Sequence, residues 1–387
     1  MNRASSSIPL GMTAVVDLDA ARRTLRHGPR LRAMRAAGER LHARIADGPR
    51  VVAVRTLPLA TLPYPTKFAF NGAALSPAPF VTFTHRCVLV QFMQMGALKS
   101  LLFNPTDVDG ARATPFFADL ASHFPKRLEP LFAKRFDSLE SQIASLGLER
   151  GDIDYVAFDH FHTQDLRPLL GTEDGRIAPR FPNATLLAAK SEWDEWDDLH
   201  PMQRGWFVRD GKLGVRTDRV ALVDGDLELG DGVLLVRTPG HTSGNQTLFF
   251  HTHQGIWGIS ENGACADNWS PLDSKIAGLA AYCRRYDVDV VINANTPEAG
   301  AEQYTSMVLE RTIVDRVGRA PAFVQMFPSS EVTPGMLAPG LAPTFVHRTV
   351  TSGDVALGSL SARARRLGAE APRPPRAARV RVRSTTP

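Results

Sequence analysis

The sequence predicts an α/β fold in which helices and sheets pack as layers, and three observations carry this prediction. Strand-like runs open the fold at residue 51, and helical and strand-like segments then alternate as far as residue 292. The 387 residues are 43% hydrophobic, which is enough for a full core. We expect a main domain over 51–360, an N-terminal helical extension over 1–50 and a basic, disordered tail over 361–387.

The N-terminal extension is expected to be helical because its apolar residues recur at helical spacing. Met34, Leu41 and Ile45 fall on one face of a helix drawn over residues 17–46. Gly28 and Pro29 should interrupt that helix near its start. We therefore expect one or two amphipathic surface helices.

Strands are predicted where β-branched and aromatic residues form short runs bounded by Pro, Gly or Asn. A longer helix is predicted over 115–147, ending at Gly147, and a shorter one over 273–286. The expected strand segments are 51–60, 80–92, 99–105, 152–158, 184–188, 219–223, 233–237, 246–250, 255–259 and 288–292.

Charge argues against a nucleic-acid-binding core. The net charge is +5, but residues 361–387 hold eight arginines against one glutamate, and residues 1–50 hold ten arginines against four acids. Segment 51–360 therefore carries −8 by subtraction, which nucleic-acid phosphates would repel. The Pro- and Arg-rich tail has the composition of a solvated end.

The cellular setting is predicted from what the sequence does not contain. No apolar run approaches the length of a membrane span, and the N-terminus has no apolar core of a signal peptide. Cys87, Cys265 and Cys283 are widely spaced, as reduced, buried thiols would be. We expect a cytoplasmic protein that acts on a small molecule.

Two histidines lie one residue apart in "DHFHTQD", directly after the strand-like run "IDYVAF". His160 and His162 can both turn toward one point in a loop that follows a strand. A third histidine, His241, lies in the Pro-Gly turn "TPGHTSGN" between two predicted strands. The three would form a His₃ site with an open position for water, which is the ligand set of a catalytic zinc.

These motifs resemble those of the metallo-β-lactamase fold superfamily, whose members carry H-x-H-x-D-H after a strand and T-P-G-H-T-x-G-H in a later turn. Here they read "HFHTQD" and "TPGHTSGN", and the resemblance extends over about residues 51–300. It implies a four-layer αββα sandwich with the metal site at one edge between two sheets.

The second metal site of that family is altered in this sequence. Its ligand positions fall on Gln164, near Asn262 and near Asn295, whose neutral amides are weak zinc ligands. Asp165, next to Gln164, is our candidate for an additional ligand, and Glu261 is an alternative acid. The general base would be Asp165 or the metal-bound hydroxide itself. The resemblance therefore implies a divergent member that binds one ion, zinc or iron.

Three functions follow from this site. The first is a metal-dependent hydrolase that activates water against an ester, lactone, thioester or amide carbonyl. The second is a non-catalytic binding or structural protein that keeps the sandwich. The third is a mononuclear iron enzyme, because His₃ ligation leaves positions open on an octahedral ion.

Other candidate residues are given structural interpretations. His251 and His253 in "HTHQG" are expected in a solvated hairpin turn, and the helix around Trp193 and Trp196 should pack its tryptophans and expose its acids. Trp206 and Phe207 are candidates for the mouth of a substrate site.

Overall fold

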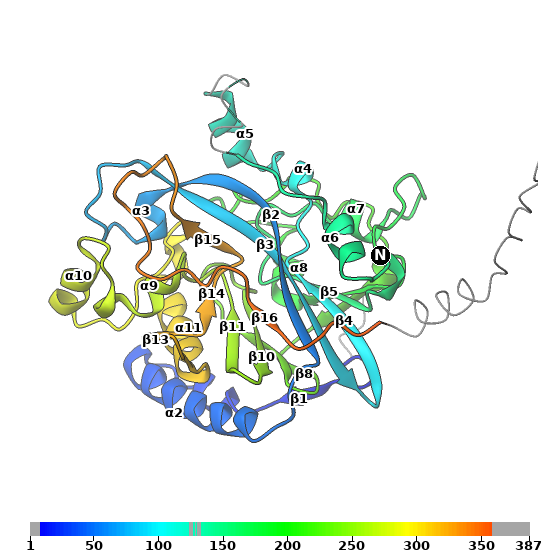
Figure 1. Cartoon of the computed structure of the whole chain (residues 1–387), viewed down its shortest axis with the longest axis horizontal. Helices are drawn as coiled ribbons and strands as arrows, with labels where there is room; N and C mark the ends of the chain where they lie inside the picture. The colour runs from blue at the N-terminus through cyan, green and yellow to red at the C-terminus, as the bar shows by residue number, and fades with distance from the viewer. Residues whose placement is uncertain (1–7, 124–126, 128, 130–132, 358–387) are drawn as a thin grey trace, which may run out of the picture.

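The computed structural model describes residues 8–357, apart from 124–126, 128 and 130–132. Two β-sheets face one another, and helices cover their outer faces (Figure 1). The tail predicted over 361–387 lies outside the described residues. No helix in the described part of the chain is long and apolar enough to cross a membrane.

The first sheet has the strand order β1-β8-β9-β10-β11-β14. Neighbouring strands are antiparallel, except that β11 and β14 are parallel. The strands are β1 (Thr13–Val15), β8 (Asp226–Gly230), β9 (Val233–Arg237), β10 (Gln246–Thr252), β11 (Gly255–Ile259) and β14 (Met326–Phe327).

The second sheet has the order β16-β2-β3-β4-β5-β6-β7, and β15 also pairs with β3. Its strands from β4 to β7 are parallel. They are β2 (Ala53–Pro65), β3 (Phe80–Gln94), β4 (Ala97–Phe103), β5 (Tyr155–Ala157), β6 (Thr185–Ala189), β7 (Val220–Val223), β15 (Ser330–Thr333) and β16 (Thr351–Ser352). A separate ribbon pairs β12 (Arg316–Val317) with β13 (Ala320–Val324).

Alternation along the strands builds the layers, because successive side chains of a strand point to opposite faces. In β3, Val88 and Val90 enter the core between the two sheets, while Cys87 and Leu89 enter the core on the outer face. In the first sheet, Leu248 of β10 likewise faces the second sheet. Each sheet is therefore apolar on both faces, as a sheet between two layers has to be.

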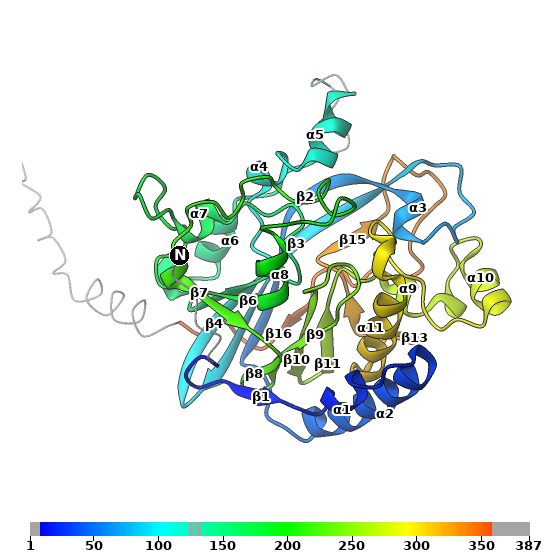
Figure 2. The same ribbon diagram turned by 180° about the vertical axis from the view of Figure 1, so that it is seen from behind.

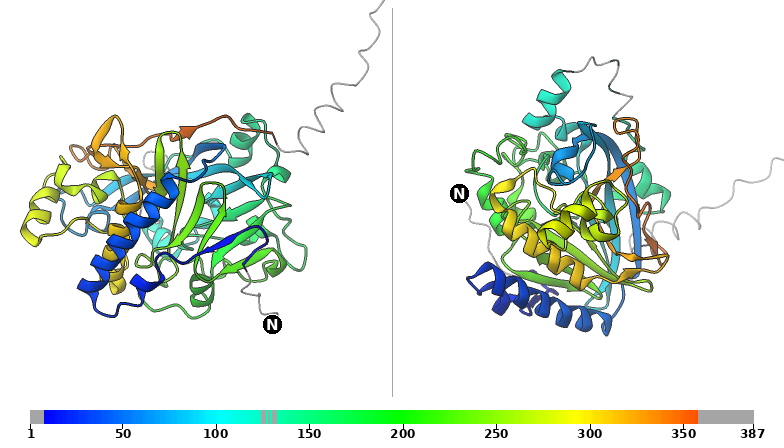
Figure 3. Two further views of the ribbon diagram at one scale, coloured as in Figure 1. Left: turned by 90° about the horizontal axis from the view of Figure 1, so that it is seen from below. Right: turned by 90° about the vertical axis from the view of Figure 1, so that its left-hand side faces the viewer.

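Helices complete the outer layers. On the first sheet, α2 (His27–Ala46) and α11 (Gly300–Ile313) lie side by side, with their apolar residues in one core with β9, β10 and β11 (Figures 2 and 3). On the second, the outer core includes α3 (Thr66–Ala69), α6 (Leu139–Ser145), α7 (Arg167–Leu170) and α10 (Leu279–Tyr286). The remaining α-helices of the described chain are α1 (Asp19–Arg22), α4 (Val108–Ala111), α5 (Pro115–Ser122), α8 (Lys190–Glu195) and α9 (Ala266–Trp269). The predicted αββα sandwich is confirmed.

Three expectations about single elements differ from the structure. Residues 13–46 are part of the sandwich, because β1 pairs with β8 and α2 covers the first sheet. The helix expected over 115–147 is replaced by α5 and α6, with Arg135 in a β-bridge between them. Residues 288–292 are coil in which Val290 and Val291 are buried and the N–H of Val291 donates to the carbonyl of Asn268; a short apolar run does not distinguish a strand from such a segment.

Candidate metal centre

The two histidine loops come from opposite sheets and meet at one edge of the sandwich. His160 and His162 follow the carboxyl end of β5, and His241 lies in the loop that joins β9 to β10. The N–H of Gln246 donates to the carbonyl of Asp159 at 2.9 Å, which ties the start of β10 to the first loop. The sandwich thereby brings together histidines that are about eighty residues apart.

The three histidines form a compact cluster. One ring nitrogen of each lies within 4.8 Å of the other two, and all three side chains are buried. Nδ1 of His162 is 3.2 Å from Nε2 of His241. Two nitrogens bound tetrahedrally to zinc at about 2.0–2.1 Å are about 3.3 Å apart, so this separation suits two ligands of one ion.

The other ring nitrogens are held in ways that fix which nitrogen faces the cluster. Nδ1 of His160 is 2.8 Å from an Asp159 carboxylate oxygen, and Nε2 of His162 is 2.6 Å from Oε1 of Gln203. Each of these oxygens can accept a hydrogen bond from the ring N–H, which leaves the opposite nitrogen with its lone pair. Nδ1 of His241 is buried without a hydrogen-bond partner in the described structure.

Electrostatics favour neutral imidazoles at two of the three positions. Burial, and then the charge of His160, lower the pKa of His162 and of His241 well below the ordinary value. Burial also lowers the pKa of His160, but the adjacent Asp159 carboxylate outweighs it and the net shift is upward. Because metals bind the unprotonated ring, the cluster has the donor set of a metal site.

Asp165 lies apart from this cluster. Its carboxylate accepts hydrogen bonds from the backbone N–H, Nε and Nη2 of Arg167, the shortest at 2.6 Å. It belongs neither to the group of converging ligand atoms nor to the lining of the adjacent cavity. The sequence suggested Asp165 as a ligand and general base, but in the structure its carboxylate is engaged in an ion pair with Arg167.

The three amides of the altered second site have separate roles. Gln164 donates to Thr106 Oγ1 and to the carbonyl of His162, at 3.0 and 3.2 Å. Asn262 lies beneath the site, where it accepts from the N–H of His241 and donates to Glu310. Asn295 lines the cavity, and its Oδ1 is buried without a partner in the described structure.

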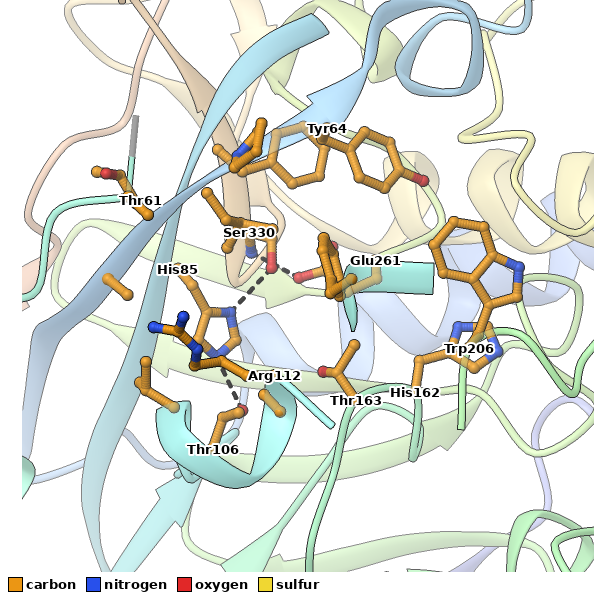
Figure 4. A pocket seen from close by; sticks show the side chains of 18 of the residues that line it. Thr61, Tyr64, His85, Thr106, Arg112, His162, Thr163, Trp206, Glu261 and Ser330 are labelled. Atoms are coloured by element: carbon orange, nitrogen blue, oxygen red, sulfur yellow. Dashed lines mark hydrogen bonds between the residues drawn. The ribbon is translucent and has the colours of Figure 1, made fainter. Parts of the chain in front are cut away.

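Glu261, and not Asn262, faces the cavity beside the histidines (Figure 4). One carboxylate oxygen accepts the N–H of Ser330 at 2.5 Å. Burial, and then the negative charge of Asp159, raise the pKa of Glu261. The structure therefore puts a carboxylate on the cavity wall one residue before the position indicated by the motif.

A chain of polar side chains closes the wall next to Glu261. His85 of β3 lies between the hydroxyls of Ser330 and Thr106, 2.8 Å from each (Figure 4). Burial lowers the pKa of His85 to about 4, so the ring is neutral at physiological pH. With both nitrogens engaged by hydroxyls, His85 is a fixed part of the wall.

The cavity beside the histidines has a volume of about 390 Å³. Trp206 lies on its wall, as expected for a substrate mouth, and is stacked on Phe116 with ring centroids 4.4 Å apart. Phe207 packs instead against the ring of His162. Apolar side chains form much of the rest of the lining, among them Leu62, Pro63, Tyr64, Phe83, Val108, Phe117 and Leu120.

Several residues that organise the site were not singled out from the sequence. Asp159 directly precedes His160, and this adjacency was an available signal for a carboxylate behind a ligand. Gln203 and Glu192 gave no such signal, because both reach the site from elsewhere in the chain. Glu192 lies among the acids of the helix around Trp193 that were expected to be exposed, yet it is 2% exposed.

The remaining candidates are structural. Trp196 is buried as expected. His251 is a buried residue of β10 with Nδ1 3.1 Å from the carbonyl of Pro49, so the expectation of a solvated turn holds for the exposed His253 and not for His251.

Neither family models nor curated protein sequences match this chain. Solved structures do. An N-acyl homoserine lactone hydrolase with N-hexanoyl-L-homoserine bound at its catalytic metal centre is 18% identical, with a TM-score of 0.41 over 62% of this chain and 88% of that one. A probable metal-dependent hydrolase from Staphylococcus aureus is 12% identical, with a TM-score of 0.45 over 68% and 84%.

A further match is a hydrolase of the beta lactamase superfamily, AbOPH, which is 16% identical with a TM-score of 0.40 over 67% of this chain and 84% of that one. Similarity at this level does not carry an activity from one protein to another, so the chemistry of the site has to decide the function.

Proposed function

We propose that this protein is a metal-dependent hydrolase that uses one ion, preferentially zinc, to cleave an ester, lactone, thioester or amide. The observation that carries the proposal is the convergence of three buried imidazole nitrogens at the edge of a largely apolar cavity. A site that combines ligands, an open position and a concave apolar surface suits a small organic substrate.

His160, His162 and His241 would hold the ion. When bound, it would lower the pKa of a water molecule at the open position and polarise the substrate carbonyl. Asp159 and Gln203 would keep two of the rings in the required tautomer. The apolar walls would exclude bulk water from the reacting atoms.

Glu261 is better placed than Asp165 to act as the general base. Its carboxyl lies on the cavity wall with its pKa raised to about 8, and a bound dication would favour the ionised form, which can take a proton from the attacking water and return it to the leaving group. Asp165 would first have to break its bidentate contact with Arg167. We therefore assign the proton transfer to Glu261.

The proposal is tested by metal analysis followed by a panel of esters, lactones, thioesters and amides. Zinc-loaded protein should hydrolyse at least one class, and Glu261→Gln should lower kcat by about 10²- to 10⁴-fold, the usual contribution of a general base. Metal content should stay unchanged in that variant. Glu173→Gln, at an exposed loop position outside the cavity lining, is the matched control and should behave as wild type.

Two other outcomes would each replace the proposal. Protein that binds no metal would support a non-catalytic sandwich, for which the altered second site is the favourable observation. Tightly bound iron with colour or oxygen sensitivity would support a mononuclear iron enzyme.

A further inference from the structure

The cavity has two chemically different ends. Its inner end contains the histidine cluster with Asp159 and Glu261, all of which are buried. Its outer end contains exposed and partly exposed side chains from β2, α5 and residues 129 and 133–135. Figure 4 shows Thr61 and Arg112 on the opposite side of the pocket from His162 and Trp206.

Charge changes sign between these ends. The carboxylates of Asp159 and Glu261 lie at the inner end. The outer lining carries three cations, Arg112, Lys134 and Arg135, against the single carboxylate of Glu129. Asp109, which contacts Arg135 from outside the lining, brings the balance to three cations against two carboxylates, so a net charge of +1 remains at the end remote from the histidines.

The two arginines already have anionic partners. Arg112 pairs with Glu129 at 2.5 Å, and Arg135 forms a bidentate contact with Asp109. Lys134 forms no ion pair with any residue that the structure describes; its ammonium lies over the ring of Phe136, 4.9 Å from the centroid. Among the described residues that line this end, Lys134 is thus the cation that remains for a ligand.

Backbone contacts fix Lys134 at the outer end of the cavity. Its carbonyl accepts from the N–H of Thr61 at 2.7 Å, and its own N–H donates to the hydroxyl of Thr61 at 2.8 Å. Thr61 belongs to β2, so a strand of the second sheet holds Lys134 in place. Apolar residues, including Val108, Phe117 and Leu120, line the same cavity.

We propose that the substrate is an acyl compound with an apolar middle and an anionic group at the end remote from the scissile bond, and that Lys134 binds this anion. The inference rests on the proposed hydrolase function, because the histidine cluster defines which end reacts. Such a ligand would match the cavity in three respects: a carbonyl at the metal, a chain along the apolar walls and a carboxylate at the rim.

The catalytic test compares two esters that differ only in the distal group, 4-nitrophenyl hexanoate and mono-4-nitrophenyl adipate. Zinc-loaded wild type should have the higher kcat/KM for the adipate. Lys134→Met should reduce the ratio of adipate to hexanoate kcat/KM by about three- to five-fold, the size expected of an exposed ion pair, mainly through KM. Raising the salt concentration should also reduce the ratio of adipate to hexanoate kcat/KM in wild type, because salt screens the charge of Lys134.

Lys67→Met is a matched control. Lys67 is also exposed and also lies 4.9 Å from a phenylalanine ring centroid, that of Phe68, but it does not line the cavity. It should leave the ratio at the wild-type value. A ratio that is unchanged in Lys134→Met, or that falls equally in Lys67→Met, would overturn the assignment.

A binding measurement separates this inference from the proposed function. Hexanamide and 6-amino-6-oxohexanoate carry the same primary amide in place of the ester. Their affinities for metal-free protein, in which the proposed reaction cannot cleave them, can be followed by the change in tryptophan fluorescence, to which Trp206 on the cavity wall contributes. The anionic amide should bind more tightly than hexanamide in wild type, and Lys134→Met should remove most of the difference. If wild type binds the anionic amide more tightly but its zinc-loaded form hydrolyses no ester, the proposed function is contradicted and the role of Lys134 is not. Equal affinities for the two amides, or no binding of either, would contradict the role of Lys134.

Discussion

Glu192 accepts a hydrogen bond from the backbone N–H of Gly244 at 3.1 Å, and its other carboxylate oxygen accepts the N–H of Phe161 at 2.8 Å. One buried carboxylate thereby joins the loop of His160 and His162 to the loop of His241. The contact is close, because a Cβ at position 244 would lie 2.3 Å from the Cβ of Glu192. Glu192 is therefore a positioning residue for the whole cluster.

Glu192→Ala should weaken zinc binding by about 10- to 100-fold, as removal of groups behind metal ligands commonly does. Competition with a chromophoric chelator measures this affinity. Glu192→Gln keeps one acceptor oxygen and should lose less, and Asp198→Asn, at an exposed position after α8, is the control. Wild-type affinity in Glu192→Ala would show that the two loops hold their places without the carboxylate.

His160→Ala and His241→Ala should abolish tight metal binding to the same extent, although the two residues lie in loops that follow strands of different sheets. Each leaves two imidazoles, which bind zinc far more weakly than three. Metal content after dialysis against a mild chelator is the measurement. His253→Ala removes an exposed histidine and should retain the metal; full retention by His241→Ala would exclude that residue as a ligand.

The sequence predicted the parts of the site that lie next to one another in the chain. The His-x-His spacing and the Pro-Gly-His turn give the three histidines because local motifs specify loop shape. Asp165 was favoured for the same reason, yet the nearest cation, Arg167, also follows it in sequence and binds it. Sequence proximity alone cannot decide whether Asp165 serves the metal site or forms an ion pair with Arg167.

The parts that the sequence did not predict depend on packing between distant segments. Glu261 and Asn262 are neighbours in the segment that follows β11. The side chain of Glu261 faces the cavity, whereas that of Asn262 lies beneath the site and binds Glu310. Gln203 reaches His162 from a loop forty-one positions later. The strands were easier to predict, because runs of β-branched and aromatic residues such as 80–92 are a local pattern, and the sandwich was implied by the resemblance of the two histidine motifs.

The protein should bind one tight equivalent of zinc. Among the described residues, the three histidines form the one group of converging His, Cys, Asp and Glu ligands, and the second-site positions hold amides. Titration of metal-free protein under chelator competition should show a single tight step. Two tight equivalents would require Glu261 or Asp165 to move into coordination.

Asn262→Asp should not restore a second metal site. The Nδ2 of Asn262 donates to Oε1 of Glu310 at 2.7 Å, so aspartate would replace a buried donor with a like charge. The lost hydrogen bond alone costs about 1–3 kcal/mol, and repulsion adds to it when both groups are ionised. Urea unfolding at pH 8 should show the loss, and a variant as stable as wild type that binds a second zinc ion would contradict the structure.

Glu310 should make folding stability depend on pH. Burial raises its pKa to about 7, although hydrogen bonds from Asn262 and Trp269 oppose the shift. In the unfolded chain the Glu310 carboxyl loses its proton near the ordinary pKa of 4.5, whereas in the folded protein it keeps the proton until the pH reaches about 7. Between pH 4.5 and 7 the folded state therefore binds more protons than the unfolded state. The contribution of Glu310 to the free energy of unfolding is fully present below pH 4.5 and falls by about 3 kcal/mol as the pH rises to 7.

Glu310→Gln removes this titration, so the slope of unfolding free energy against pH should become more positive than in wild type between pH 4.5 and 7. The slope is a better measure than the stability itself, because glutamine also disturbs the hydrogen bond that Trp269 Nε1 donates to Glu310. Urea unfolding at half-unit intervals gives both quantities. Glu173→Gln, at an exposed loop position, should keep the wild-type slope. Parallel curves for wild type and Glu310→Gln would mean that Glu310 is ionised throughout this range, with its hydrogen-bond donors sufficient to hold the charge.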